Sequence, residues 1–235
     1  MKKTVRLLVA SIIAISANSA IAESGKWYIG VSAGQSSYND WVSQADITAF
    51  KDEFGSSLGV VNFDGAQSAN SDDSPFGFKL FGGYSFYKNI AVEFSYLNMG
   101  EVDSNSSASG TFYDALENPI DGDLSAFTKA NVDAFTLDVN LNVPMTSVIA
   151  LIVKAGVYAA DTKLEIDAGG DIPGVENINY SKTDSSTGLH YGIGVNFKVT
   201  DAIGLRAEWE RLDSVEANDG ESDVDLLSAA LVYNF

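Results

Sequence analysis

The stretch 189–200, LHYGIGVNFKVT, alternates strictly between two kinds of residue. Leucine, tyrosine, isoleucine, valine and phenylalanine hold one register, whereas histidine, glycine, asparagine, lysine and threonine hold the other. Successive side chains of a β-strand point to opposite faces, so a period of two predicts a strand with one apolar and one polar face. The stretch therefore indicates a sheet that separates two different environments.

Seven further segments follow the same rule with more noise, which predicts eight strands in total. The eight segments are 27–34, 76–86, 90–96, 135–143, about 148–166, 189–200, 203–210 and 223–235. Short connections (YKN, PMTS and TDA) alternate with long ones, which are residues 35–74, residues 98–130, about 20 residues after Ile166, and residues 212–223. Short turns at one end and long loops at the other are typical of a transmembrane β-barrel. We therefore expect an all-β, eight-stranded, antiparallel up-and-down barrel that spans a membrane.

Charged residues decide which face of the strands points inward. Eight of them share the polar register: Lys79, Glu93, Asp138, Lys154, Lys198, Arg206, Glu208 and Glu210. Eight strands enclose a space just wide enough for side chains. Ionised groups inside, with tryptophan, phenylalanine and leucine outside, indicate that lipid surrounds the barrel. The alternative, a soluble barrel of the lipocalin kind, leaves these inward charges unexplained.

The first 22 residues have the pattern of a secretory signal peptide. Lys2, Lys3 and Arg6 precede an apolar core, LLVASIIAI, and the small-x-small sequence Ala20-Ile21-Ala22 follows. The apolar core is much shorter than the roughly 20 residues of a membrane-spanning helix. We expect residues 1–22 to be removed on export and residues 23–235 to form the barrel domain.

Charge and cysteine content exclude several classes of function. The net charge is −18, and without the three positive residues of 1–22 it becomes −21, which disfavours nucleic acid as a partner. The absence of cysteine excludes disulfides and thiolate metal sites, and the sequence predicts neither a cofactor nor a resident metal. The long connections, with the third taken as 161–186, hold 24 of the 32 acids and only four bases. Such acidic loops suit divalent cations that bridge to lipopolysaccharide phosphate, or else form a solvated, repulsive surface. Within the first loop, QADITAFKDEFG (44–55) has helical spacing of its apolar residues.

Several stretches together resemble the eight-stranded transmembrane domain of the outer membrane protein A family. They are WYIGVSAG (27–34), FGGYSF and IAVEFSYLNMG (within 81–100), VPMT (143–146), LRAEWERL (205–212) and the closing YNF. The resemblance implies residence in the outer membrane of a Gram-negative bacterium, in contact with lipid and lipopolysaccharide. It also implies an inward pair between Glu93 and Arg206. The terminal pattern Leu231, Tyr233 and Phe235 matches the family's recognition signal for the outer-membrane assembly machinery.

Two interpretations of the inward charges remain open. In the first, Glu93, Arg206, Lys79, Lys154, Lys198 and Glu208 cross-link the lumen into a plug. In the second, the pair of Glu93 and Arg206 acts as a gate. His190, the single histidine, lies in the inward register and is expected to be an interior polar group, since no neighbouring pattern supports Ser-His-Asp catalysis.

The fold alone does not specify a function, because one scaffold hosts many activities. The sequence favours a non-enzymatic surface or structural protein, with adhesion or environmental contact as its role. The alternatives are a narrow, porin-like channel for ions or small solutes and a lipid A-modifying enzyme.

Overall fold

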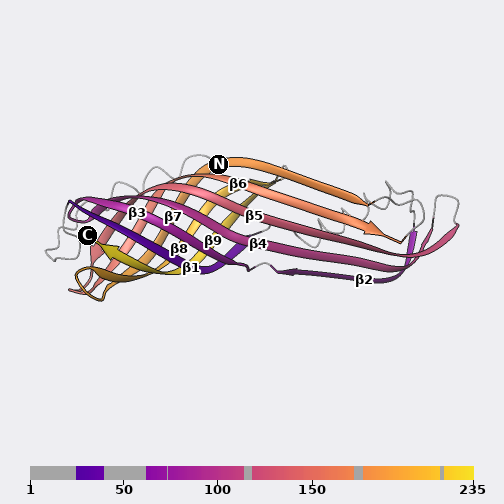
Figure 1. Ribbon diagram of the computed structural model, residues 1–235, viewed down its shortest axis with the longest axis horizontal. Helices are drawn as coiled ribbons and strands as arrows, with labels where there is room; N and C mark the ends of the chain where they lie inside the picture. The colour runs from indigo at the N-terminus through magenta and orange to yellow at the C-terminus, as the bar shows by residue number, and fades with distance from the viewer. Residues whose placement is uncertain (1–24, 40–61, 73, 114–117, 172–176, 218–219) are drawn as a thin grey trace, which may run out of the picture.

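The computed structural model describes residues 25–39, 62–72, 74–113, 118–171, 177–217 and 220–235. The predicted signal peptide (1–22) and the predicted helix at 44–55 lie outside the described residues. Nine antiparallel strands make up the described structure (Figure 1): β1 Lys26–Asn39, β2 Asn62–Asp72, β3 Phe76–Tyr87, β4 Ile90–Tyr113, β5 Pro119–Pro144, β6 Ile149–Gly170, β7 Ile178–Lys198, β8 Ile203–Ala217 and β9 Gly220–Asn234. Among these residues, none forms a helix with the length and hydropathy that a membrane span requires.

Eight of the strands close into a ring, which confirms the predicted barrel. The order around the ring is β4-β3-β1-β9-β8-β7-β6-β5, and β5 pairs again with β4. The last strand closes against the first: Val31 lies opposite Leu231, and Phe235 N donates to Trp27 O at 3.0 Å. Within the ring, closure pairs the backbone of each strand on both sides, which a lipid environment demands. The C-terminus is therefore part of the sheet.

The outer face of the ring carries the apolar register, as the sequence predicts. Phe94, Phe197 and Leu231 are each about half exposed, whereas the alternating Glu93, Lys154 and Arg206 are almost completely buried. A band of exposed aromatic and aliphatic side chains around a barrel is what acyl chains cover in a membrane.

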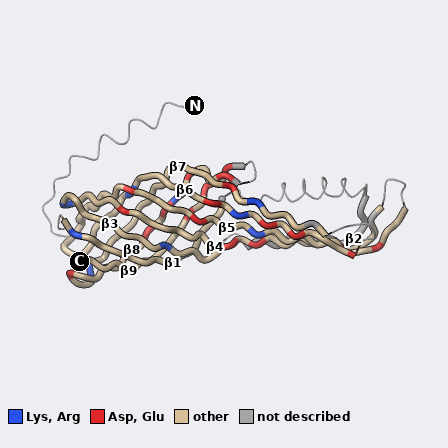
Figure 2. The backbone as a smooth tube through the Cα atoms, turned by 45° about the horizontal axis from the view of Figure 1, so that its top comes forward, with Lys and Arg blue, Asp and Glu red and all other residues tan. Residues whose placement is uncertain are grey.

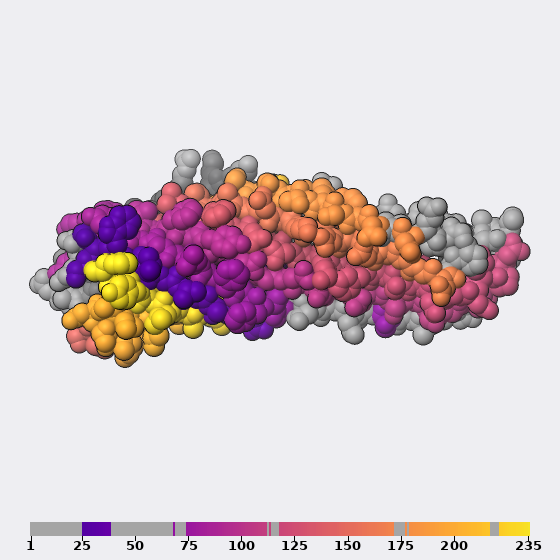
Figure 3. All heavy atoms as spheres, viewed as in Figure 1, coloured from indigo at the N-terminus to yellow at the C-terminus, as the bar shows by residue number. Residues whose placement is uncertain are grey.

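Strand β2, which is not part of the ring, and long extensions of four ring strands form a sheet that projects beyond the barrel (Figures 1 and 3). β2 pairs only with the far half of β4, from Asn62 opposite Tyr113 to Asp72 opposite Asp103. β7 pairs with β8 only from His190 onward, although it pairs with β6 along residues 178–197. The projecting part therefore has the strand order β2-β4-β5-β6-β7, with β2 and β7 at its edges.

This sheet corrects the prediction of long loops at this end. Most of residues 98–130 belongs to β4 and β5, and part of residues 35–74 belongs to β2. Strand residues of β6, β7, β8 and β9 also take up much of the third and fourth predicted loops. The projecting strands are rich in serine, aspartate and threonine on both faces, so they lack the alternation that marks a half-buried strand. Continued pairing from the barrel, rather than local pattern, extends them.

Two β-bulges mark the level at which the strands leave the barrel. In β4 the register shifts between Asn98 and Glu101, around Gly100, whose φ is +77°. A Cβ at this glycine would lie 2.6 Å from the carbonyl oxygen of Phe76, so a side chain would require the backbone to move. In β8 the shift falls between Leu212 and Val215. Bulges bend a strand and increase its twist, which re-aims β4 toward the projecting sheet.

Candidate functional site in the barrel lumen

A network of ion pairs fills the middle of the lumen. Arg206 Nη1 lies 2.8 Å from Glu93 Oε2, and Lys154 Nζ lies 3.0 Å from Glu93 Oε1. Lys79 Nζ lies 2.8 Å from Glu208 Oε2 and 2.7 Å from Glu210 Oε2. All of these side chains have at most 4% of their surface exposed.

Lys154 is the centre of this network. Besides Glu93, its ammonium lies 2.8 Å from both Glu208 Oε1 and Glu210 Oε1. Buried charges are tolerated when each finds partners of the opposite sign, and here each lysine has at least two. The structure thus brings together five of the six residues predicted from sequence.

The sixth residue, Lys198, is a correction to the predicted network. Its Nζ lies 2.6 Å from Asp201 Oδ1, and both residues sit at the short-turn end, where Asp201 is almost fully exposed. Lys198 is in the inward register, but the barrel ends at its level, so its long side chain reaches a turn carboxylate instead of the lumen network.

Polar side chains that were not among the predicted site residues complete the network. Tyr28 O–H donates to Glu93 Oε2 at 2.9 Å, and Asn140 Nδ2 donates to the same oxygen at 2.9 Å. Glu210 contacts both buried lysines. Its position in the inward register of 205–212 was the available signal.

His190 lies inside the barrel, as expected for an interior polar group. Its Nδ1 is 2.7 Å from Asp138 Oδ1, which requires Nδ1 to be the donor, and its Nε2 is 3.6 Å from Glu210 Oε1. Thr136 Oγ1 donates to the other oxygen of Asp138 at 2.8 Å. In the described lumen, four carboxylates (Glu93, Asp138, Glu208 and Glu210) face three permanent cations (Lys79, Lys154 and Arg206).

An apolar layer covers the network on the side of the projecting sheet. It contains Tyr38, Leu97, Met99, Val102, Val132, Ala134, Tyr158, Ala160, Leu212, Val215, Val224 and Leu226. Leu97, Met99, Leu212 and Leu226 have no exposed surface. The sequence analysis assigned inward charges but did not predict this apolar layer.

The residues on the outer face of the barrel at this level explain why the layer is apolar. In β8 the outward register changes from Trp209 to Arg211 while the inward register changes from Glu210 to Leu212. In β9 the outward residue changes from Leu227 to Asp225 at the same level. Polarity inverts because the strands here leave the apolar band and meet water, so the barrel packs apolar side chains inward like a soluble protein.

An ion-pair cluster ties β8 to β9 at this boundary. Arg211 donates from Nε and Nη2 to the two oxygens of Asp225 at 2.6 and 2.7 Å, and from Nη1 to Asp223 at 2.9 Å. These hydrogen bonds raise the pKa of Arg211 above its usual value. The arrangement is a bidentate arginine–carboxylate pair, the most geometrically specific form of ion pair.

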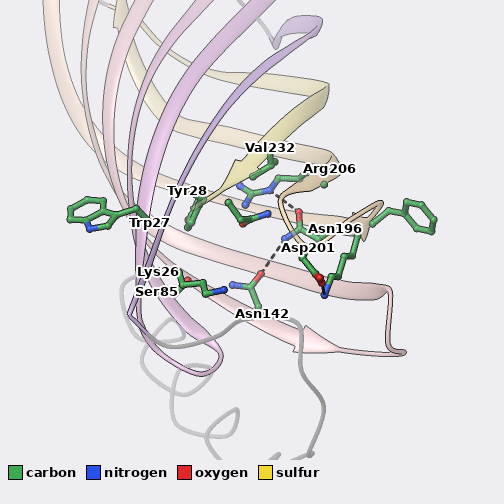
Figure 4. A pocket seen from close by; sticks show the side chains of 13 residues that line it. Lys26, Trp27, Tyr28, Ser85, Asn142, Asn196, Asp201, Arg206 and Val232 are labelled. Atoms are coloured by element: carbon green, nitrogen blue, oxygen red, sulfur yellow. Dashed lines mark hydrogen bonds and ion pairs between the residues drawn. The ribbon is translucent and has the colours of Figure 1, made fainter.

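A cavity of about 330 Å³ opens at the short-turn end below the network (Figure 4). Arg206 forms its inner wall, and Lys26, Asn142, Asn196 and Lys198 line its sides. The cavity therefore reaches the charged network from the short-turn end only as far as Arg206.

The predicted assembly signal lies on the outer face of β9 and on Phe235, the residue that follows it. Leu231, Tyr233 and Phe235 are about half exposed or more, and the rings of Tyr233 and Phe235 meet edge to face with centroids 5.1 Å apart. The structure presents all three in the apolar register.

The predicted acidic surface lies on the projecting sheet, where red acidic positions outnumber blue basic ones in Figure 2. Several of its acids are already paired: Lys129 Nζ lies 2.6 Å from Glu101 Oε1, and Lys182 Nζ lies 3.2 Å from Asp184 Oδ2. Within the described ranges, no three histidine or acidic residues are arranged to hold a metal ion.

Comparisons with known proteins identify a family and several solved structures to which the chain is similar. The model of the family described as outer membrane protein beta-barrel domain matches residues 7–235. No curated protein matches the chain. Among solved structures, the attachment invasion locus protein Ail of Yersinia pestis has 18% identity and a TM-score of 0.41, covering 91% of this chain and 100% of its own. The outer membrane protein OprG of Pseudomonas aeruginosa has 14% identity and a TM-score of 0.46, covering 93% and 99%. Neisserial surface protein A has 13% identity and a TM-score of 0.44, covering 89% and 97%.

Proposed function

Because this chain belongs to the outer membrane protein beta-barrel domain family, we propose that it is a non-enzymatic surface protein whose projecting sheet makes adhesive contact outside the cell. The barrel lies in the outer membrane of a Gram-negative bacterium, with the short turns toward the periplasm and the projecting sheet toward the exterior. The single observation that carries the proposal is this sheet, which continues four ring strands well beyond the apolar band (Figure 1).

The composition of the sheet supports a contact surface. Its described strands are polar and rich in hydroxyl groups, with the side chains of Thr111 and Asp121 hydrogen bonded at 2.6 Å and those of Ser185 and Asp161 at 2.6 Å. Such cross-strand pairs stabilise a sheet that has no apolar face to bury. A rigid platform of this kind loses less conformational entropy on binding than a flexible loop.

The lumen favours a structural barrel over a channel. A water-filled path would need exposed side chains along the axis, yet the ion-pair network and the apolar layer are both almost fully buried. The buried position of His190 and its pairing with Asp138 also disfavour a lipid A-modifying enzyme, because a lipid substrate has no open route to the imidazole.

The test is a binding assay on cells that carry either the full protein or a variant in which residues 103–129 are replaced by a short turn. We expect adhesion to extracellular matrix or host cells to fall to the level of an unrelated eight-stranded barrel at equal surface density. The trimmed variant must still migrate as a folded barrel in unheated gel samples. Unchanged adhesion in a folded trimmed variant contradicts the proposal.

Two further measurements address the alternatives. Purified protein in a planar lipid bilayer is expected to show no discrete conductance steps, and steps would instead favour the channel. Overexpression is expected to leave the mass of lipid A unchanged. A change that disappears in His190→Ala would favour the enzyme.

A further inference from the structure

The periplasmic cavity presents hydrogen-bond donors in a fixed arrangement (Figure 4). Arg206 Nε donates to Asn196 Oδ1 at 2.9 Å, and Asn196 Nδ2 donates to Asn142 Oδ1 at 3.3 Å. Arginine has only donors, so the Asn196 amide must turn its oxygen toward Arg206 and its nitrogen toward Asn142. The same constraint then applies to Asn142, whose oxygen faces Asn196.

This relay leaves the Asn142 amide nitrogen available to the cavity. Among the described residues, no acceptor lies within hydrogen-bond distance of Asn142 Nδ2. Arg206 is itself held by Glu93 at 2.8 Å and lies over the rings of Tyr28 and Phe81, with centroid distances of 5.4 and 4.8 Å. The origin of the relay is therefore rigid, and the orientation of its last amide follows from it.

The described lining of the cavity holds more cationic than acidic side chains, in contrast to the whole chain. It includes Lys26, Lys198 and Arg206 and one carboxylate, Asp201, and Arg206 is paired with Glu93. The chain as a whole has 32 acidic and 14 basic residues. The pair of Lys198 and Asp201 is exposed to solvent, and pairs of this kind contribute little to stability, so Lys198 can turn to another anion at small cost.

We propose that this cavity binds a small oxyanion, a phosphate or carboxylate group, between the Asn142 amide and the ammonium group of Lys198. A cavity of about 330 Å³ accommodates such a group together with the first atoms of whatever carries it. Charge-assisted hydrogen bonds from ammonium groups to oxyanions are stronger than neutral ones, and the amide supplies direction. The group can come from a periplasmic solute or from a phospholipid headgroup of the inner leaflet.

The test follows the side-chain amide signals of Asn142 and Asn196 by NMR in protein labelled with ¹⁵N-asparagine. The protein is dissolved in a maltoside detergent, which contains no phosphate, and titrated with sodium phosphate or sodium acetate. We expect saturable shifts of both signals. Binding is expected to weaken at least tenfold in Asn142→Asp, which replaces the donor by an anion, and in Lys198→Gln.

Lys88→Gln is the matched control, because Lys88 lies exposed in the neighbouring β3–β4 turn and does not line the cavity. We expect affinity within twofold of the unmodified protein. The absence of saturable shifts with both anions, an equal loss in Lys88→Gln, or undiminished binding in folded Asn142→Asp and Lys198→Gln each overturns the proposal.

Nanodiscs that contain phosphatidylglycerol separate the two sources. Signals already at the bound position before any salt is added identify the headgroup as the ligand. Signals that move only after phosphate is added identify a soluble anion. Because the experiment reads the periplasmic end alone, its result is independent of adhesion by the extracellular sheet.

Discussion

Arg206 and Glu93 pair across the full width of the barrel: Arg206 Nη1 lies 2.8 Å from Glu93 Oε2, and their strands, β8 and β4, occupy opposite positions in the ring. No backbone hydrogen bond joins these strands, so the pair connects walls that are otherwise linked only around the circumference. Glu93 also accepts hydrogen bonds from Lys154, Tyr28 and Asn140. The pair is therefore part of a cross-link between opposite walls, and its loss affects several strands.

Arg206→Ala is expected to lower the free energy of unfolding by about 3 kcal/mol, because it removes one partner of a buried carboxylate. Urea-induced unfolding in detergent, followed by tryptophan fluorescence, measures the change. Lys198→Ala removes a cation from an exposed pair at the rim and is expected to cost less than about 1 kcal/mol. Equal losses in the two variants would show that the buried network has no special role in stability.

Leu226→Ala tests the apolar layer. Leu226 has no exposed surface, whereas its neighbour Leu227 is 63% exposed on the outer face. Removing the buried side chain leaves a cavity, and we expect a loss of about 2–5 kcal/mol. Leu227→Ala makes the same chemical change without an internal cavity and should cost clearly less in the same unfolding experiment. The reverse order would contradict the assignment of the layer as a packed core.

Leu137→Arg tests the lipid-facing register of β5. Leu137 lies opposite Phe94 of β4 and is 53% exposed, between Phe135 and Val139 of the same band. An arginine deep in the apolar band of a membrane barrel costs about 2–4 kcal/mol. Reversible folding into lipid vesicles measures the difference.

The control for this variant is Ser125→Arg, which lies in the same strand and register but on the projecting sheet. We expect its folding free energy to change by less than about 0.5 kcal/mol, as is usual for exposed positions. A comparable loss at both positions would place Leu137 outside lipid.

Phe235→Ala tests the proposed assembly signal. In cells, we expect less folded protein in the outer membrane, whereas purified protein refolded in detergent should keep nearly the stability of the unmodified barrel. The matched control is Phe197→Ala, which removes the same ring from another lipid-facing position, near the short-turn end of β7. An equal assembly defect in both variants would indicate a general effect of lost apolar surface rather than terminal recognition.

The sequence by itself determined the barrel, its closure and its orientation toward lipid. Period-two alternation, as in 189–200, reports directly on the two faces of a strand, and the inward charges distinguish lipid from water outside. The inward positions of Glu93, Lys154 and Arg206 followed from register alone, because each strand residue has only two faces available.

Only the tertiary structure decided which inward groups meet, where the inward side chains change from charged to apolar, and how far the sheet continues beyond the barrel. Lys79 contacts Glu208 and Glu210 across the lumen, although these glutamates lie about 130 positions further along the chain. Lys198 is excluded from the lumen network because the barrel ends at its level. The apolar layer and the projecting strands depend on the height at which lipid gives way to water and on pairing with neighbours. Both are properties of the assembled ring, because a strand's pattern shows its two faces but not its partners or its depth.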